Sequence, residues 1–272
     1  MIKVGYIHVD GQIRYISEKL NVEHFPDNTL LLKTPNIDFS KHIEIEWYYE
    51  SDVELFAIIC LAKKAKSKSL IMPYCPHARQ DRIKGIEDTF TLKYFAEVIN
   101  SLGFESVTVL DPHSPVCEAL IDNIIVQHPR KQIVDALVNI PGVDVLLYFP
   151  DAGAAKRYSD LIPGYKYLYG NKKRRWEDGI ITGTEVVNPF NVEVEGKTIL
   201  IIDDICSRGT TFVKSAEALK ELGVGNIYLY VTHCENTILD GDVLTSGLIE
   251  KVFTTNSIFT KEHEKIKVLE LN

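Results

Sequence analysis

Short apolar runs and amphipathic segments alternate along the chain. The segment from Ser51 to Lys66 has apolar residues at i, i+3 and i+4 spacing, which predicts a helix with one buried face. Ser51 and Glu54 have the spacing of a capping box at its start. Lysines gather at its end, where the negative end of the helix dipole favours them. The apolar stripe consists of Val53, Phe56, Ala57, Cys60 and Leu61.

Further strands and helices follow in alternation. The predicted strands are residues 69–74, 106–110, 144–149, 197–202 and 225–231. The predicted helices are residues 92–99, ended by Gly103, and 212–222, followed by Gly223. The run at 197–202 is mostly apolar, as expected of a strand buried on both faces of a parallel sheet. The alternation favours an α/β fold with mainly parallel sheets flanked by helices.

The chain shows two features of organisation. The region of Pro129 is a candidate boundary, which gives domains of residues 1–130 and 131–272. The last strand is a candidate for returning to the N-terminal domain. Residues 171–189 lack clear periodicity, so we interpret them as a long loop or a flexible hairpin, and loops of this length are often functional.

Composition excludes several classes of protein. The 272 residues are 45% hydrophobic, which is enough for two sizeable cores. The net charge of -8 argues against nucleic acid as a main partner. The five cysteines show no C-x-x-C spacing, which argues against a zinc ribbon or redox dithiol and fits a reducing cytoplasm. The start is short and β-like, so we expect no secretory signal, and no apolar run is long enough to span a membrane.

Acidic residues or histidine follow three of the predicted strands. Ligands of open parallel sheets bind beyond the carboxyl ends of the strands, so we expect His113, Asp151, Asp203 and Asp204 to face one crevice. Carboxylates and an imidazole near a phosphate suit magnesium, which takes few protein ligands and shares substrate oxygens. The alternative for any single aspartate is that it caps the next helix. The agreement of three strand ends favours the crevice.

The most specific feature is the segment from Asp203 to Thr211, which lies between a buried strand and a helix. Small hydroxylated residues and glycine let backbone N–H groups surround a phosphate, helped by the helix N-terminus. Asp203 and Asp204 repel a phosphate, so we expect them to hold ribose hydroxyl groups or a metal beside it. The alternative is an ordinary acidic turn. The predicted phosphate-binding residues are Ser207, Arg208, Gly209, Thr210 and Thr211.

This segment resembles the ribose-binding signature of type I phosphoribosyltransferases and of phosphoribosyl pyrophosphate synthetases. Residues 73–82 (PYCPHARQDR) resemble the ATP-site segment of the synthetases, and residues 110–113 (LDPH) resemble their aspartate-x-histidine stretch. Residues 150–157 (PDAGAAKR) resemble their proline-aspartate-x-glycine-x-x-x-arginine element. Residues 172–175 (KKRR) stand where the synthetases carry a mobile catalytic loop, and residues 254–258 (TTNSI) match a late strand. The order agrees over nearly the whole chain, which resembles a short, divergent member with two phosphoribosyltransferase-type domains.

The resemblance implies a role for each matching residue. Asp203 and Asp204 would contact the ribose hydroxyl groups. His113, Asp151 and Asp203 would be magnesium ligands. Lys173 and Arg175 would close over the transferring diphosphate and, with His113, form the catalytic set. The implied ATP-binding residues are Arg79, Gln80, Asp81 and Arg82, with Phe25 and Asp27 contributed to the adenine by a neighbouring subunit, which makes the protein at least a homodimer.

The implied reaction is transfer of diphosphate from ATP to the anomeric hydroxyl of ribose 5-phosphate, giving phosphoribosyl pyrophosphate for nucleotide biosynthesis, and AMP. Three alternatives stay open. Arg208 departs from the family pattern and adds a bulky cation beside the phosphate pocket, so the acceptor is alternatively a larger conjugate such as ADP-ribose, in NAD metabolism. A phosphoribosyltransferase would consume the product, but the segment at 79–82 argues against it. A non-catalytic regulatory subunit is disfavoured because Lys173, His113 and Asp151 are present.

Overall fold

The computed structural model describes residues 1–272 except 8–12, 18, 21, 143, 175–180 and 272. The chain forms two compact units, Met1–Gln127 and His128–Asn272, and each is described by itself. Both units contain a mainly parallel sheet flanked by helices, so the predicted fold class is confirmed.

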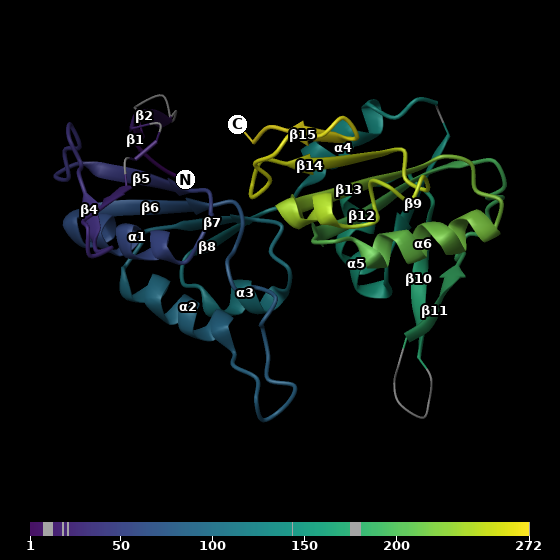
Figure 1. Ribbon diagram of the computed structural model, residues 1–272, viewed down its shortest axis with the longest axis horizontal. Helices are drawn as coiled ribbons and strands as arrows, with labels where there is room; N and C mark the ends of the chain where they lie inside the picture. Colours follow the sequence, from purple (N-terminus) through teal and green to yellow (C-terminus); the bar gives the residue numbers. More distant parts are fainter. Residues whose placement is uncertain (8–12, 18, 21, 143, 175–180, 272) are drawn as a thin grey trace. The chain divides into compact units, whose positions relative to one another are not determined.

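The sheet of the first unit has the strand order β2-β1-β5-β6-β7-β8. The four strands from β5 to β8 are parallel, whereas β1 and β2 are antiparallel additions at one edge. Figure 1 shows the three helices on one side of this sheet, where their apolar residues join those of the strands in one core. A separate hairpin pairs β3 with β4. The elements are β1 (Ile2–Ile7), β2 (Ile13–Ser17), β3 (Val22–His24), β4 (Leu30–Leu32), β5 (His42–Trp47), α1 (Val53–Lys64), β6 (Ser67–Met72), α2 (Thr91–Ser101), β7 (Val107–Leu110), α3 (Pro115–Leu120) and β8 (Ile124–Gln127).

The sheet of the second unit has the order β11-β10-β9-β12-β13-β14-β15 and is parallel from β10 to β15. Alternate residues of β12 enter two apolar clusters. One contains residues of α6, and the other contains residues of α4 and α5, so the sheet is covered on both faces. This burial explains the continuous apolar run that predicted the strand. The elements are α4 (Arg130–Val138), β9 (Val145–Phe149), α5 (Ala152–Tyr158), η1 (Ser159–Leu161), β10 (Tyr167–Arg174), β11 (Ile181–Val187), β12 (Thr198–Cys206), α6 (Thr210–Glu221), β13 (Ile227–Cys234), η2 (Asn236–Asp240), β14 (Lys251–Thr255) and β15 (Ile266–Leu269).

Three details differ from the predictions or decide between them. The strand predicted to end at Ile202 continues to Cys206, because Asp203 and the residues after it extend the ladder with β13. Of the two interpretations of residues 171–189, the hairpin describes the backbone, since β10 and β11 pair antiparallel. The last strand, β15, pairs with β14 in the sheet of the second unit.

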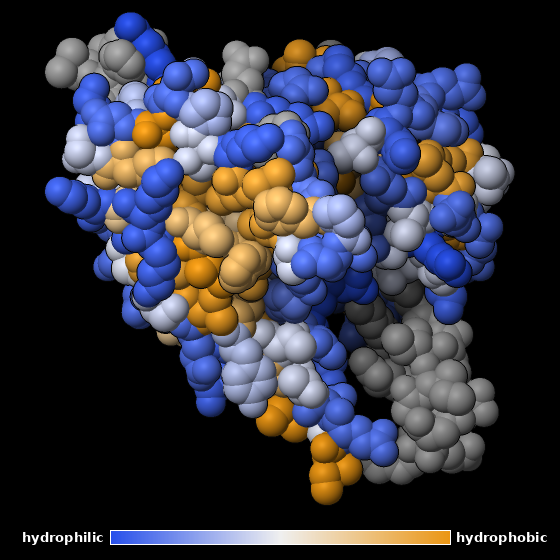
Figure 2. Space-filling model, turned by 60° about the vertical axis from the view of Figure 1, so that its left-hand side comes forward, coloured by the Kyte–Doolittle hydropathy of each residue, from blue (hydrophilic) through white to orange (hydrophobic). Residues whose placement is uncertain are grey.

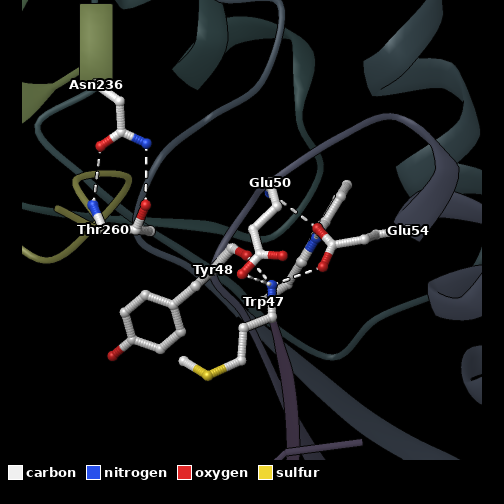
Figure 3. A network of polar contacts seen from close by, with 7 residues as sticks. Trp47, Tyr48, Glu50, Glu54, Asn236 and Thr260 are labelled. Atoms are coloured by element: carbon white, nitrogen blue, oxygen red, sulfur yellow. Dashed lines mark hydrogen bonds and ion pairs between the residues drawn. The ribbon is translucent and has the colours of Figure 1, made fainter. Parts of the chain in front are cut away.

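The capping box predicted from Ser51 and Glu54 is wrong. The N-cap residue of α1 is Asp52, whose side chain makes no capping hydrogen bond. The Glu54 carboxylate instead accepts hydrogen bonds from the N-terminal ammonium group at 2.6 Å, from the Trp47 indole at 2.9 Å and from the Glu50 backbone N–H at 2.9 Å (Figure 3). The ammonium group adds the attraction of opposite charges to its hydrogen bond, and the buried indole N–H would be costly to leave without an acceptor, so the tertiary contacts prevail.

Strand β5 carries two glutamates on the sheet face opposite the apolar core. Glu46 is satisfied by the Tyr15 hydroxyl at 2.8 Å, the Tyr48 hydroxyl at 3.0 Å and the Lys3 ammonium group at 3.2 Å. Glu44 is buried beside it. Burial, followed by the charge of Glu46, raises the pKa of Glu44 to about 7.

This raised pKa predicts how stability depends on pH. The folded protein retains the Glu44 proton up to about pH 7, whereas an unfolded chain releases it near its ordinary value of 4.5. The stabilisation is therefore fully present below pH 4.5 and is lost as the pH rises through 7. Glu44→Gln does not titrate, so relative to the natural protein it should gain about 1–2 kcal/mol of unfolding free energy between pH 5 and pH 8.

Urea unfolding at the two pH values measures this gain. Glu87→Gln is the matched control, because Glu87 is exposed. The assignment is wrong if the two variants show the same difference from the natural protein at both pH values.

Candidate active site

Acidic residues of the second unit meet at the carboxyl ends of two paired strands. β9 and β12 run parallel with Tyr148 opposite Ile201, so Asp151, just beyond β9, lies at the same sheet edge as Asp203 and Asp204 of β12. The capping alternative is confirmed for Asp151, whose Oδ1 accepts the Ala154 N–H at 3.0 Å at the start of α5.

The carboxylates at this edge act on one another electrostatically. Burial, followed by the charge of Asp204, raises the pKa of Asp203 well above its usual range, and the charge of Asp151 adds to the rise. Asp203 Oδ1 also accepts the Asp204 backbone N–H at 3.0 Å. The guanidinium of Arg157 lies 3.4 Å from Asp204 Oδ1 and partly offsets the negative charge. The edge suits a ligand that brings hydroxyl groups or a cation.

The segment that follows is a tight turn into α6. Gly209 is the N-cap residue with φ of 79°, in the left-handed region that glycine adopts readily. The N–H groups of Phe212 and Val213 donate to the Gly209 carbonyl. The earlier N–H groups of the helix, at Thr210 and Thr211, have no acceptor within the helix, so they are available to an anion at its positive end.

Contacts that the sequence did not predict hold this turn in place. The Ser207 hydroxyl lies 3.0 Å from the Thr237 hydroxyl. A Cβ on Gly209 would lie 2.0 Å from Val243 Cγ2, and a Cβ on Gly241 would lie 2.0 Å from the Arg208 carbonyl oxygen. The segment from η2 to Val243 therefore packs closely under the turn. It lies some thirty residues further along the chain, and no local sequence signal marks it.

Arg208 stands apart from these contacts. Its side chain is exposed, and it has no ion-pair partner among the described residues. A cation thus lies beside the predicted phosphate position and is available to a ligand.

The ATP-site segment of the first unit is organised around Asp81. Both oxygens of this buried carboxylate bind Arg82, with Asp81 Oδ1 at 2.7 Å from Nε and Oδ2 at 2.8 Å from Nη2. The hydrogen bond with Arg82 is the main cause that lowers the pKa of Asp81 to about 2, and Ser114 and His113 lower it further. The structure therefore brings Asp81, Arg82 and His113 together. Ser114 was missed, although it directly follows His113.

The remaining predicted ATP-binding residues lie in two segments of the first unit. Gln80 accepts a hydrogen bond from the Thr91 hydroxyl at 2.8 Å, which ties the segment to the start of α2. Arg79 has an exposed side chain. Phe25 is 48% exposed in the turn between β3 and β4. In the same turn Asp27 accepts hydrogen bonds from the Thr29 backbone N–H at 3.0 Å and hydroxyl at 2.7 Å, as in an ordinary surface turn.

The structure describes only part of the predicted catalytic loop at residues 172–175. The backbone of Lys173 belongs to β10 and pairs with Gly183, whereas its side chain and the whole of Arg175 lie outside the described residues. Within the described part of the chain, no group of three or more His, Cys, Asp or Glu side chains can hold a metal ion by itself. The helices of the described residues include none with both the length and the apolar character needed to cross a bilayer.

The packing of the turn predicts a specific loss of stability. Gly209→Ala should destabilise the protein by about 1 kcal/mol through the left-handed backbone, and by about 1–3 kcal/mol more through the clash with Val243. Gly164→Ala is the control, because Gly164 has φ of 92° with open space around it and carries the backbone cost alone. Chemical unfolding should rank Gly209→Ala clearly below Gly164→Ala. Equal stabilities would mean that Val243 does not pack under the turn.

Sequence comparisons relate the chain to known enzymes. Residues 183–272 match the family model of the phosphoribosyl synthetase-associated domain. The chain is 30% identical to ribose-phosphate pyrophosphokinase 2 of Enterococcus faecalis, over 91% of this chain and 79% of the relative. It is 27% identical to ribose-phosphate pyrophosphokinase of Pyrococcus furiosus, over 96% and 94% of the two chains.

A solved structure shows the same fold. Phosphoribosylpyrophosphate synthetase from Mycobacterium smegmatis superposes with a TM-score of 0.73 at 18% identity, covering 93% of this chain and 86% of that one. The sequence identity and coverage of the relatives establish the family, and the structural match agrees in fold. The chain therefore belongs to the ribose-phosphate pyrophosphokinase family and is an enzyme of that type.

Proposed function

We propose that this enzyme transfers the terminal diphosphate of ATP to the anomeric hydroxyl of ribose 5-phosphate, giving phosphoribosyl pyrophosphate and AMP. The supporting observation is the second unit's combination of an anion-binding turn with adjacent carboxylates. The N–H groups at the start of α6 suit the 5-phosphate, and Asp203 and Asp204 suit the ribose hydroxyl groups. The names of the relatives support the same product.

In this reaction the anomeric oxygen attacks the β-phosphorus of ATP in line. The bond between the β-phosphorus and the oxygen that bridges it to the α-phosphorus breaks, and AMP leaves with the bonding electrons. The hydroxyl proton passes to solvent. Such transfers depend on positioning and on neutralising charge. The turn from Ser207 to Thr211 would fix the acceptor. Lys173 and Arg175 would close over the diphosphate and exclude water that would otherwise hydrolyse ATP.

For ATP, the proposed contacts are Arg79, Gln80 and Arg82. Asp81 would act through Arg82, since both of its oxygens already bind that guanidinium. A guanidinium fork held in this way is suited to phosphate oxygens. Ser114 and His113, which also lower the pKa of Asp81, would stabilise the same arrangement.

Magnesium is the metal that the donor set fits. In the second unit the proposed ligands are Asp151 and Asp203, which share one sheet edge. His113 is the proposed ligand in the first unit. Burial, followed by the charge of Asp204, raises the pKa of Asp203, and a cation beside these carboxylates would relieve their mutual repulsion. Magnesium would suit them because it takes few protein ligands and shares substrate oxygens. When bound, magnesium would neutralise charge on the transferring phosphates.

A homo-oligomer, at least a dimer, is also part of the proposal. Figure 2 shows apolar side chains gathered on one face of the first unit. A groove between β4 and α1 is lined by Leu30, Leu31, Leu32, Phe56 and Leu61, and Phe56 is 58% exposed. Exposed apolar patches of this kind mark interaction surfaces. Phe25 and Asp27 would then serve the adenine of a neighbouring copy. Sedimentation velocity that finds a monomer at all concentrations would exclude this assembly.

We propose that the enzyme acts in the cytoplasm, where its five cysteines, all free thiols, would stay reduced.

A second candidate acceptor is ADP-ribose, which carries a second phosphate beyond the ribose 5-phosphate. The observation that favours it is Arg208, an exposed cation beside the phosphate turn with no ion-pair partner among the described residues. A guanidinium in this position would bind the additional phosphate.

An acceptor screen with ATP and magnesium tests both candidates, scored by acceptor-dependent release of AMP. We expect AMP with ribose 5-phosphate. Activity confined to ADP-ribose, reduced by Arg208→Ala, would establish the second candidate. Base-dependent release of pyrophosphate without ATP cleavage would contradict both and indicate a phosphoribosyltransferase.

Lys173→Ala should lower turnover by about 10² to 10³, the usual cost of losing an oriented charge on the transition state. Its thermal stability should change little, because Lys173 lies near the end of β10, where that strand pairs only with the edge strand β11. Lys131→Ala, which removes an exposed lysine from α4, is the control. Near-normal turnover of Lys173→Ala on the true acceptor would remove this residue from the catalytic set.

A further inference from the structure

We infer that Arg157 is a positioning residue for the acceptor, because its guanidinium holds the Asp204 carboxylate in the orientation that receives the ribose hydroxyl groups. This inference rests on the proposed function. It adds to that function a residue that would touch neither substrate and would act through Asp204.

The position of Arg157 is fixed by the elements around it. It lies in the last turn of α5, and Asp151 caps the first turn of the same helix. Its guanidinium carbon lies 5.6 Å from the centre of the Tyr158 ring. Tyr158 is fully buried and stacks on Phe149 of β9, with ring centres 6.3 Å apart. The guanidinium therefore projects from a rigid base at the end of β9.

From that base Arg157 reaches the neighbouring strand. Its Nη1 is buried and lies 3.4 Å from Asp204 Oδ1. The Asp204 side chain is only 6% exposed. A buried carboxylate is costly without a nearby cation, so the guanidinium lowers the cost of placing this side chain here.

The pair also influences the second carboxylate. The Asp204 backbone N–H donates to Asp203 Oδ1 at 3.0 Å, which couples the placement of the two residues at the end of β12. Loss of the guanidinium would leave Asp204 buried without this cation, and its side chain would turn toward solvent. The hydroxyl-binding geometry beside the phosphate turn would change with it.

Packing of the fold does not explain why a charge is needed here. α5 is held to the sheet by Ala154, Ala155 and Tyr158, which belong to an apolar cluster with Leu200 and Ile202 of β12. Buried ion pairs often contribute no more to stability than apolar residues of the same size. An ion pair at this point is better explained by the orientation of Asp204 toward a polar ligand.

The test compares Arg157→Ala with Lys156→Ala, which removes an exposed cation from the same helix. Arg157→Ala should raise the KM for ribose 5-phosphate at least about tenfold, equivalent to about 1.4 kcal/mol, with the KM for ATP nearly unchanged. Lys156→Ala should behave like the natural enzyme. Arg157→Lys should recover part of the loss, because it restores the charge without the planar fork.

A substrate analogue separates orientation of Asp204 from general damage. The natural enzyme should prefer ribose 5-phosphate to 2-deoxyribose 5-phosphate, and Arg157→Ala should lose most of that preference. If Arg157→Ala fails to fold, Arg157→Gln provides the same comparison with a neutral side chain that can still form hydrogen bonds.

Two results would overturn the inference while leaving the proposed function intact. One is an acceptor KM for the Arg157 variants equal to that of Lys156→Ala, and the other is an unchanged preference for the 2-hydroxyl. If ADP-ribose is the true acceptor, its KM replaces that of ribose 5-phosphate in the comparison. If the natural enzyme uses neither acceptor, the proposed function fails and this inference fails with it.

Discussion

The parallel pairing of β9 with β12 is the constraint on which the candidate site of the second unit depends. It sets the ends of two strands side by side, so that the residues just beyond Phe149 and Ile201 share one sheet edge. Asp151, Asp203 and Asp204 are thereby brought close enough for their charges to act on one another. The turn at Gly209 follows directly on β12, so the N-terminus of α6 lies next to these carboxylates in the chain.

In each unit an arginine side chain lies against a buried carboxylate. Arg157 lies against Asp204 in the second unit, and Arg82 binds both oxygens of Asp81 in the first. In both pairs a guanidinium lies against a buried carboxylate. The two guanidinium groups differ in exposure, because Arg82 is exposed, whereas Nη1 of Arg157 is buried. Under the proposed function, the first pair would present a cation to ATP, and the second would present a carboxylate to the acceptor.

Local patterns predicted the elements well where burial alone decides them. The apolar run of β12 follows from burial on both faces of the sheet, and the helix α1 is present where periodicity predicted it. The predicted apolar stripe of α1 is wrong in part, because Val53 and Phe56 are exposed and the buried residues are Ala57, Ile58, Leu61 and Ala62. The end of β12 was misplaced because its ladder with β13 continues through the acidic pair, which only the partner strand determines. The capping box failed for a similar reason, since Glu54 binds groups outside its own helix.

The aspartates and the turn could be predicted as site residues because each stands at the end of a strand. The residues that pack against the turn and against the aspartates could not be predicted from the sequence. Val243 and Gly241 pack under the turn from a distant segment, and the partner of Arg157 is defined by the pairing of β9 with β12. The Asp151 cap was predicted only as an alternative to metal binding, because a carboxylate after a strand suits both roles.

A crystal structure of the enzyme with bound ribose 5-phosphate would show whether the turn and the two carboxylates hold the acceptor. We expect the phosphate to lie against the backbone N–H groups of residues 207–211 and the sugar hydroxyl groups to lie within hydrogen-bond distance of Asp203 or Asp204. A sugar phosphate bound elsewhere, with this turn and the two carboxylates left in contact with solvent, would contradict this expectation.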